Sequence, residues 1–265
     1  MNWYRSKRIW ITGASSGLGR ALAIGAAALG ARPILSGRDE GRLEEVGAAC
    51  REVGGEAELL PFDICDSEGR RRGIEAVSRD RLDGLINNAG VSQRSLVAGT
   101  GLEVYRQLFE TNLMSAIDLT LGTLPLIRRS GDGRIVAISS IAGELYGPQR
   151  SGYGASKAGM NAFFYSLRSE VAPEGIGVTV VIPGFIRTEV SRNALTGEGE
   201  RYGRMDSIQE RGMDPTAAAR RILADVAAGK RCCRVAMAPK LRFGLFMRTL
   251  VPSLYDRAMR SARVT

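Results

Sequence analysis

Histidine is absent from the 265 residues of this chain, and that absence excludes several classes of mechanism. Without an imidazole there can be no Ser-His-Asp hydrolysis, no histidine-ligated zinc and no histidine acid or base. A general acid must come from another side chain. Cysteine is scarce too: there are four, two of them adjacent and none in a C-x-x-C arrangement. We therefore expect reduced, structural thiols and no metal site.

Long apolar runs are also missing. No uncharged run reaches the roughly 18 residues that a membrane-spanning helix requires. Residues 1–8 lead directly into the apolar segment Ile9–Ile11, which leaves no room for a signal peptide. These features predict a cytoplasmic protein.

Positive charge is in excess, with 37 Lys and Arg residues against 28 Asp and Glu and a net charge of +9. Such an excess favours anionic ligands, nucleic acid or an acidic membrane face. The basic residues are spread along the chain and are not clustered with aromatic residues. We therefore expect no nucleic-acid binding.

From residue 8 onwards, short apolar segments alternate with longer segments of helical periodicity. This alternation predicts a single-domain, Rossmann-like α/β fold, a doubly wound parallel sheet of seven strands with helices on both faces. We assign residues 1–239 to this catalytic domain and residues 240–265 to a C-terminal extension. The predicted strands are 8–12, 32–36, 57–61, 84–87, 133–139, 177–182 and 234–236, and the predicted helices are 17–30, 39–53, 67–79, 101–130, 153–173 and 214–228.

A glycine-rich turn, Thr12–Gly19, separates the first predicted strand from the first helix. Glycines here let the backbone approach a pyrophosphate held by the helix N-terminus, although an ordinary βα turn is the alternative interpretation. Arg38 follows the second strand, where an acidic residue would mark NAD. Its planar guanidinium cation can bind the 2′-phosphate of NADP(H) through paired N–H groups. A solvated arginine without a ligand is the alternative interpretation. We predict NADP(H) in preference to NAD(H).

Tyr153 and Lys157 are four residues apart and share one face of a predicted helix. A free tyrosine has a pKa of about 10, and a neighbouring ammonium favours its phenolate, so Tyr153 can serve as acid or base. Ser140 ends an apolar strand and can orient a carbonyl oxygen. An amphipathic surface pair is the alternative interpretation of Tyr153 and Lys157.

These motifs together resemble those of the short-chain dehydrogenase/reductase family over almost the whole chain. Residues 12–19 match its TGxxxGxG, 87–90 its NNAG, 183–188 its PGxxxT, and Tyr153 with Lys157 its YxxxK. The resemblance implies cofactor contacts from Gly13, Ser15, Ser16, Gly17, Leu18, Gly19, Arg38, Asp63, Asn88, Ala89, Gly90, Tyr153, Lys157, Pro183, Gly184 and Thr188.

The resemblance also implies individual roles. Asp63 would bind the adenine amino group, and Thr188 the nicotinamide carboxamide. The catalytic set would be Asn112, Ser140, Tyr153 and Lys157, with Ser140 chosen over Ser139 because it lies thirteen residues before the tyrosine. Asn112 would hold a water that links the lysine to solvent. Taken alone, Asn112 reads as a satisfied polar residue within a helix, Asp63 as a cap for the helix beginning near residue 67, and Asn87 as a helix cap or a tie between neighbouring backbone segments.

The segment 189–211 lies where the family has its mobile substrate lid, and it looks too polar to pack permanently; a disordered loop is the alternative. We expect Glu144, Leu145, Tyr146 and Gln149 to line the opposite wall of the substrate site.

In the tail, Pro252 predicts a kink. An apolar stripe of Phe243, Phe246, Met247, Leu250 and Leu254 is surrounded by Lys240, Arg242, Arg248, Arg257, Arg260 and Arg263.

This tail resembles the extension of membrane-associated family members that reduce steroids, retinoids or lipid ketones. Peripheral membrane contact, a cap over the substrate, a partner subunit and packing on the protein itself all stay open. The sequence thus predicts an NADP(H)-dependent oxidoreductase for a bulky, lipid- or steroid-like carbonyl or alcohol. A non-catalytic NADP(H)-binding regulator is the alternative. By resemblance, the helices 101–130 and 153–173 would form a homodimer or homotetramer.

Overall fold

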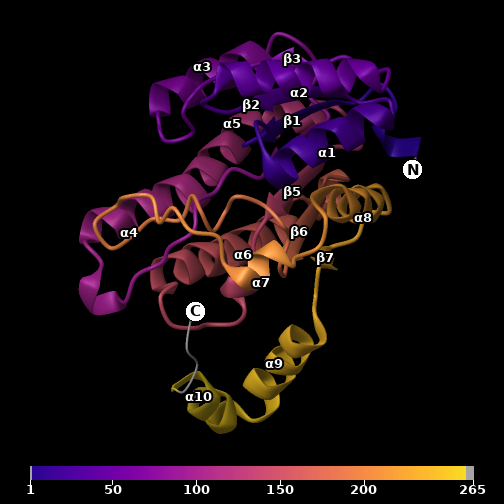
Figure 1. Cartoon of the computed structure of the whole chain (residues 1–265). Coiled ribbons are helices and arrows are strands. Elements are labelled where there is room, and N and C mark those ends of the chain that lie inside the picture. Colours follow the sequence, from indigo (N-terminus) through magenta and orange to yellow (C-terminus); the bar gives the residue numbers. More distant parts are fainter. Residues whose placement is uncertain (1, 261–265) are drawn as a thin grey trace.

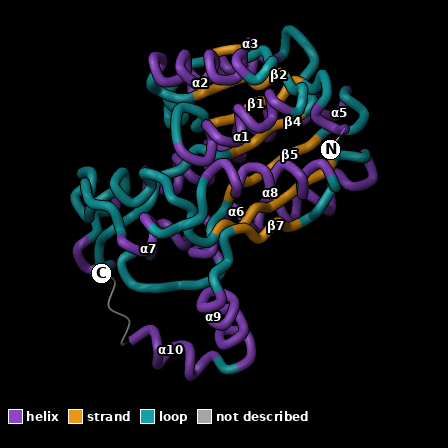
Figure 2. Tube along the Cα trace, turned by 45° about the vertical axis from the view of Figure 1, so that its right-hand side comes forward, coloured by secondary structure: helices purple, strands orange, loops and turns teal. Residues whose placement is uncertain are grey.

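A seven-stranded parallel sheet forms the centre of the computed structural model, which describes residues 2–260. The strand order is β3-β2-β1-β4-β5-β6-β7, with helices on both faces, as Figures 1 and 2 show. This order confirms the predicted doubly wound, Rossmann-like sheet. The strands are β1 (Arg8–Thr12), β2 (Arg32–Ser36), β3 (Glu58–Leu59), β4 (Gly84–Asn87), β5 (Arg134–Ile138), β6 (Gly177–Pro183) and β7 (Cys232–Val235).

The two faces of the sheet are covered by different helices. One apolar cluster joins it to α1, α2 and α8, and a second joins it to α3, α5 and α6. Every residue of β1 and β4 is buried, which explains why the central residues of both strands, Ile9–Ile11 and Leu85–Ile86, are apolar. The helices are α1 (Gly17–Ala28), α2 (Glu40–Glu52), α3 (Ser67–Val77), α4 (Leu102–Phe109), α5 (Ser115–Arg129), α6 (Ser151–Val171), α7 (Ser207–Glu210), α8 (Pro215–Ala227), α9 (Pro239–Leu250) and α10 (Pro252–Arg260).

The sheet order reverses between β1 and β4, because the chain winds from β1 outwards to β3 and then returns to pair β4 with β1. At such a switch point the loops after the two strands diverge and leave a crevice at their carboxyl ends. The predicted cofactor turn follows β1, and the NNAG segment begins in β4. The fold therefore brings them to the same edge of the sheet.

Three predicted elements differ from the structure. The helix expected over 101–130 is divided into α4, a π-helical turn at Glu110–Met114, and α5. The strand expected at 57–61 is limited to the two residues of β3. The strand expected at 234–236 starts two residues earlier and stops at Val235, because Ala236 has a left-handed backbone with φ of 56°.

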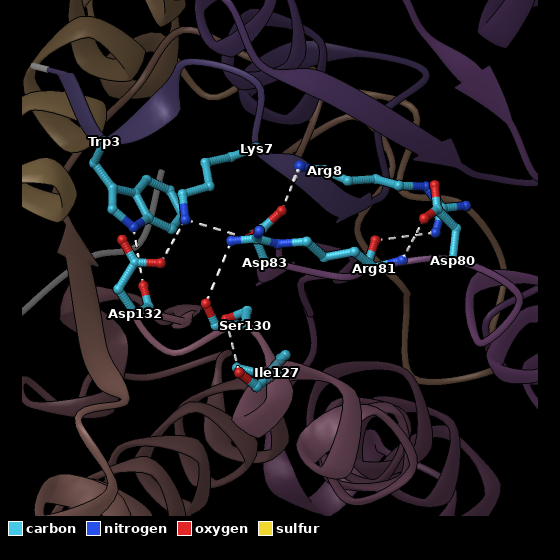
Figure 3. A network of polar contacts seen from close by, with 9 residues as sticks. All are labelled: Trp3, Lys7, Arg8, Asp80, Arg81, Asp83, Ile127, Ser130 and Asp132. Carbon is cyan, nitrogen blue, oxygen red and sulfur yellow. Dashed lines mark hydrogen bonds and ion pairs between the residues drawn. The ribbon is translucent and has the colours of Figure 1, made fainter.

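A network of charged groups lies at the opposite end of the sheet, before β1 and β4 (Figure 3). The Asp83 side chain is 1% exposed; it accepts a hydrogen bond from Arg8 N at 3.0 Å and forms ion pairs with Lys7 at 3.3 Å and Arg81 at 2.6 Å. Lys7 also pairs with Asp132, whose carbonyl accepts the Trp3 indole N–H. Asp83 thus joins the starts of both central strands to the chain before them.

We expect Asp83→Ala to lower the free energy of unfolding by about 3 kcal/mol, because two cations and a buried backbone N–H lose their shared acceptor. Asp132→Ala is the matched control. It removes another carboxylate from Lys7, but one that is 52% exposed, and should cost less than about 1 kcal/mol. Denaturant unfolding of both variants measures the difference, and equal losses would contradict a special role for Asp83.

The C-terminal segment leaves the sheet after β7 and projects from the body as α9 and α10 (Figures 1 and 2). The two helices are separated at Val251, where a kink was predicted next to Pro252. Leu241 and Leu245 pack against the core, and the Tyr255 hydroxyl donates to Tyr146 O at 2.8 Å. The predicted basic residue Arg263 lies outside the described residues.

Candidate active site

A cleft of about 1220 Å³ opens at the carboxyl edge of the sheet. It is lined by the sixteen residues for which cofactor contacts were predicted, from Gly13 in the first turn to Thr188 after β6. Of the four predicted catalytic residues, Ser140, Tyr153 and Lys157 line it and Asn112 lies behind its wall. The structure therefore brings these residues together around one cavity.

The turn after β1 suits a closely approaching anion. Gly13 and Gly17 adopt left-handed φ values of 63° and 54°, which favour glycine. Ser16, the N-cap residue of α1, makes no side-chain hydrogen bond to the helix, whereas Asp39 caps α2 and Asp66 caps α3. The first N–H groups of α1 are thus available to a ligand, and they fit a dinucleotide pyrophosphate.

Asn88, rather than Asn87, ties the loops of β1 and β4 together. Its side-chain Nδ2 donates to Thr12 O at 2.8 Å and Gly13 O at 3.1 Å, and its backbone N–H bonds the Thr12 hydroxyl. Asn87 instead points into the protein, where Nδ2 donates to the Thr120 hydroxyl at 3.1 Å. The backbone tie considered for Asn87 therefore belongs to its neighbour.

Arg38 and Asp63 both line the cleft, Arg38 after β2 and Asp63 after β3. The Arg38 side chain is 77% exposed, and its Nη1 is 3.9 Å from Asp63 Oδ2, so the guanidinium is only loosely paired. Asp63 Oδ1 accepts from Cys65 N at 2.9 Å, while the cap of α3 is Asp66. The helix-cap interpretation of Asp63 is therefore wrong. Among residues 2–260, the partner of the second oxygen, Oδ2, is Arg38.

Tyr153 is 9% exposed and lies in the first turn of α6. Burial raises the pKa of its hydroxyl, while a hydrogen bond with Ser140 and the charges of Arg150 and Arg94 lower it. The Ser139 hydroxyl has a different partner: it donates a hydrogen bond to Lys157 O at 3.2 Å. The geometry therefore selects Ser140 as the partner of Tyr153.

Lys157 is buried one turn after Tyr153, with Nζ donating to Ile138 O at 2.8 Å. Burial lowers the pKa of its ammonium to about 8. The charges that act on the Tyr153 hydroxyl are those of the two arginines. The Ser140 hydrogen bond and these two charges oppose the effect of burial on the Tyr153 pKa. The effect of Lys157 on the tyrosine stays a prediction.

Asn112 is fully buried in the π-helical turn between α4 and α5. Its Oδ1 accepts from Val91 N at 2.8 Å, and its Nδ2 donates to Val91 O at 3.0 Å and to the Ser156 hydroxyl at 2.9 Å. A π-helical turn widens the helix and frees backbone groups, and such turns are frequent at functional sites. The side chain joins the loop after β4 to α6.

The short chain dehydrogenase family model matches residues 7–199 of the chain. The chain belongs to the short-chain dehydrogenase/reductase family. Dehydrogenase/reductase SDR family member 7B of Bos taurus is 40% identical over 268 residues, covering 98% of this chain and 82% of the bovine one.

Solved structures of other short-chain dehydrogenases have the same fold. One from Burkholderia phymatum, in complex with NAD, superposes with a TM-score of 0.84 at 22% identity and covers 96% of each chain. One from Sphingobium yanoikuyae, in complex with NADPH, has a TM-score of 0.78 at 26% identity, over 98% of this chain and 97% of that one.

In this short-chain dehydrogenase the segment 189–211 is more closely packed than its polar composition suggested. Leu195 N donates to Ser92 O at 2.9 Å and Arg94 N to Leu195 O at 2.8 Å, which joins the segment to the loop after β4. The Asp206 side chain, 9% exposed, pairs with Arg94. Opposite charges are thus buried together, and the polar residues find partners within the fold. Movement of this segment as a lid stays a prediction.

Four residues around Tyr153 and the segment 189–211 were not predicted from the sequence: Gln93, Arg94, Arg150 and Asp206. Gln93 is fully buried, and its Oε1 accepts from Gly152 N at 2.8 Å and Tyr153 N at 3.2 Å, so it caps the N-terminus of α6. One available signal was the position of Gln93 and Arg94 just after β4, at the ligand-binding edge.

The wall predicted from residues 144–149 is misplaced. Leu145 and Tyr146 line a separate cavity of about 350 Å³, while Glu144 pairs with Arg234 at 2.7 Å. Gln149 lines neither cavity. The loop turns outwards, towards α9, because Arg248 of that helix stacks over the Tyr146 ring at 4.4 Å.

Proposed function

We propose that this protein is an oxidoreductase that interconverts a ketone or aldehyde and an alcohol with a nicotinamide cofactor. The observation that carries the proposal is the placement of Ser140, Tyr153 and Lys157 in the same cleft as the open N-terminus of α1. Structural relatives in complex with NAD or NADPH support the cofactor class.

A nicotinamide cofactor held in the cleft would supply the hydride that reduces the carbonyl carbon. Ser140 holds the carbonyl oxygen, and the Tyr153 hydroxyl donates its proton to that oxygen as negative charge develops. Lys157 and Arg150 are cations in the same site and stabilise the phenolate that remains. Asn112 is a positioning residue; we propose that it also supports a water through which the lysine exchanges protons with solvent.

A panel of ketones, aldehydes and secondary alcohols, assayed with NADPH and NADH side by side, tests the proposal. Turnover of at least one compound supports it. Dinucleotide binding without turnover of any compound would instead support the non-catalytic regulator, which the complete catalytic set argues against.

We further propose that NADP(H) is preferred and that Arg38, whose exposed guanidinium is only loosely paired with Asp63, binds its 2′-phosphate. Arg38→Asp is expected to shift the ratio of kcat/KM for NADPH and NADH by about 10- to 100-fold towards NADH, the value of one charged hydrogen-bonding contact. Arg51→Asp, an exposed change at the far end of α2, is the charge-matched control. Unchanged selectivity in Arg38→Asp would contradict the assignment.

We also propose a bulky apolar substrate and peripheral contact with an anionic membrane. The apolar residues of the tail are exposed, Phe243 by 62% and Leu250 by 63%, and five of the described residues of α9 and α10 are Lys or Arg against one Asp. Such a surface binds anionic lipid. Among the described residues, no helix is both long and apolar enough to cross a membrane. Equal failure to co-sediment with anionic and neutral vesicles would contradict the contact.

For a homo-oligomer, α5 and α6 offer a suitable surface. Met114, the residue just before α5, and Leu121 within α5 are 48% and 58% exposed. α6 exposes the small residues Ala155 and Ala162. A monomeric mass in light scattering would contradict the proposed dimer or tetramer.

A further inference from the structure

Two guanidinium groups lie beside Tyr153 on the wall of the cleft. Arg94 follows β4, and Arg150 immediately precedes α6. Both charges lower the pKa of the Tyr153 hydroxyl against the effect of burial. Both groups are therefore close to the atom from which the proposed proton transfer starts.

Arg94 is fully engaged by the protein. Its Nη2 and Nε bond to Asp206, and its Nη1 donates to Gln93 O at 2.7 Å and to the Ser92 hydroxyl at 3.3 Å. Its side chain is 2% exposed. Arg94 thus serves to hold Asp206 and with it the segment 189–211.

Arg150 is different, because most of its guanidinium has no partner. Its Nη2 is 3.2 Å from Asp206 Oδ2, and within residues 2–260 its other side-chain N–H groups make no hydrogen bond. The side chain is 26% exposed and lines the cleft. The guanidinium therefore has donors available to a ligand.

Positive charge exceeds negative charge in the ion-pair group that contains Arg150. Two arginines share the single carboxylate of Asp206, which Arg94 already binds in two places. Burial and the neighbouring Arg94 charge lower the pKa of Arg150. A half-buried cation of this kind is stabilised by an anion, and a guanidinium fork matches a carboxylate or phosphoryl group best.

The backbone around Arg150 is held in place. Gln149 has a left-handed φ of 62°, which is costly for a residue other than glycine, and Gln149 O accepts from Ser95 N at 3.2 Å. On the other side, Gly154 N donates to Arg150 O at 2.7 Å. Such strain persists where the surrounding structure fixes it, often at ligand-binding positions.

Arg150 lines two cavities whose other lining residues differ. Besides the main cleft it borders the cavity of about 350 Å³, whose other lining includes Leu145, Ala155 and Ala158. A charged group at Arg150 would thus have apolar surface close by. This arrangement suits a ligand with both an anionic and an apolar part.

On the basis of the carbonyl chemistry proposed above, we propose that Arg150 is a specificity-determining residue that binds an anionic group, a carboxylate or phosphoryl group, of an amphiphilic carbonyl substrate. The contact is made by the open N–H groups of Arg150, while Asp206 and Arg94 hold the guanidinium in position. The anionic group then fixes the reacting carbonyl relative to Ser140 and Tyr153.

Matched pairs of acid and ester test this assignment. The probes are 4-oxodecanoate with its methyl ester, and (2-oxoheptyl)phosphonate with its dimethyl ester, assayed with the dinucleotide that the enzyme uses. We expect at least one acid to have a lower KM than its ester, and the better pair identifies the anion. Arg150→Gln should raise the KM for that acid by about 10- to 100-fold and the KM for its ester by less than about 2-fold. Because the Arg150 charge also acts on Tyr153, kcat should fall by the same factor for acid and ester.

Two further variants separate specificity from structure. Arg150→Lys keeps the charge without the fork and should recover part of the preference for the acid. Arg71→Gln removes an exposed arginine of α3, 56% exposed and outside both cavities, and should change neither probe. Equal kcat/KM for acid and ester in both wild-type pairs, or an equal rise in KM for acid and ester in Arg150→Gln, would overturn the proposal.

Binding measurements keep this test independent of turnover. Calorimetric titration of (2-oxoheptyl)phosphonate and of 4-oxodecanoate into the wild-type protein should show binding that Arg150→Gln weakens at least about 10-fold. Absence of turnover with such binding would refute the proposed chemistry and leave the anion site supported. Turnover of esters alone, with no acid bound, would refute the anion site and leave the chemistry supported.

Discussion

Replacing Tyr153 by phenylalanine is expected to lower kcat by about 10²- to 10⁴-fold, the usual contribution of a positioned general acid or base. The ring is buried at the first turn of α6, and the change removes only the hydroxyl that Ser140 contacts. Packing is preserved, so stability and dinucleotide affinity should change little. Steady-state kinetics on any compound from the panel, with dinucleotide binding measured in parallel, gives both quantities.

Tyr105→Phe is a suitable control for this prediction. Its hydroxyl also lies near α6, where it bonds the Ser151 hydroxyl at 3.0 Å, but it does not line the cleft. It should retain kcat within about 3-fold, because it removes one hydrogen bond remote from the reacting atoms. A Tyr153→Phe variant with wild-type kcat would show that another group donates the proton.

Replacing Gly19 by alanine is expected to weaken dinucleotide binding about 100-fold, the effect of misplacing a binding group by about 1 Å. An added Cβ would overlap Gly13 O and stand 2.5 Å from Asn88 Nδ2. Both neighbours belong to the tie between the loops of β1 and β4, so neither can yield without moving the turn. Fluorescence titration with NADPH and NADH measures the loss.

Gly99→Ala is the corresponding control, because its added Cβ would meet nothing within 4 Å. It should bind dinucleotide like the wild type. If Gly19→Ala also binds normally and its fold is intact, the turn after β1 is not the pyrophosphate site.

The sheet and the cofactor turn could be predicted because their signals are local. A strand covered on both faces must be continuously apolar, as Ile9–Ile11 is, and a left-handed turn before a helix calls for glycine, as at Gly13 and Gly17. Strand ends are less well specified. β7 ends at Val235 because Ala236 has a left-handed backbone conformation. An alanine in the sequence does not indicate such a conformation.

Contacts between distant residues could not be predicted. Arg150 and Asp206 are 56 residues apart, and nothing in either neighbourhood indicates that they meet. For the same reason the segment 189–211 looked too polar to pack. The sequence does not distinguish a charged residue that is paired inside the fold from one that is exposed to water. The π-helical turn at Asn112 could not be predicted either, because the spacing of apolar residues does not show which backbone carbonyl accepts the hydrogen bond of each N–H group.

The shortness of β3 affects how this protein behaves when it is concentrated. An edge strand presents unpaired backbone groups on which another molecule can add a strand, and that addition starts aggregation. At this edge only Glu58 and Leu59 are in strand conformation, and the Glu58 carboxylate is held by Arg8 at 2.7 Å. An incoming strand would find two residues to pair with and a charge beside them, so growth of an intermolecular sheet from this side of the molecule is disfavoured.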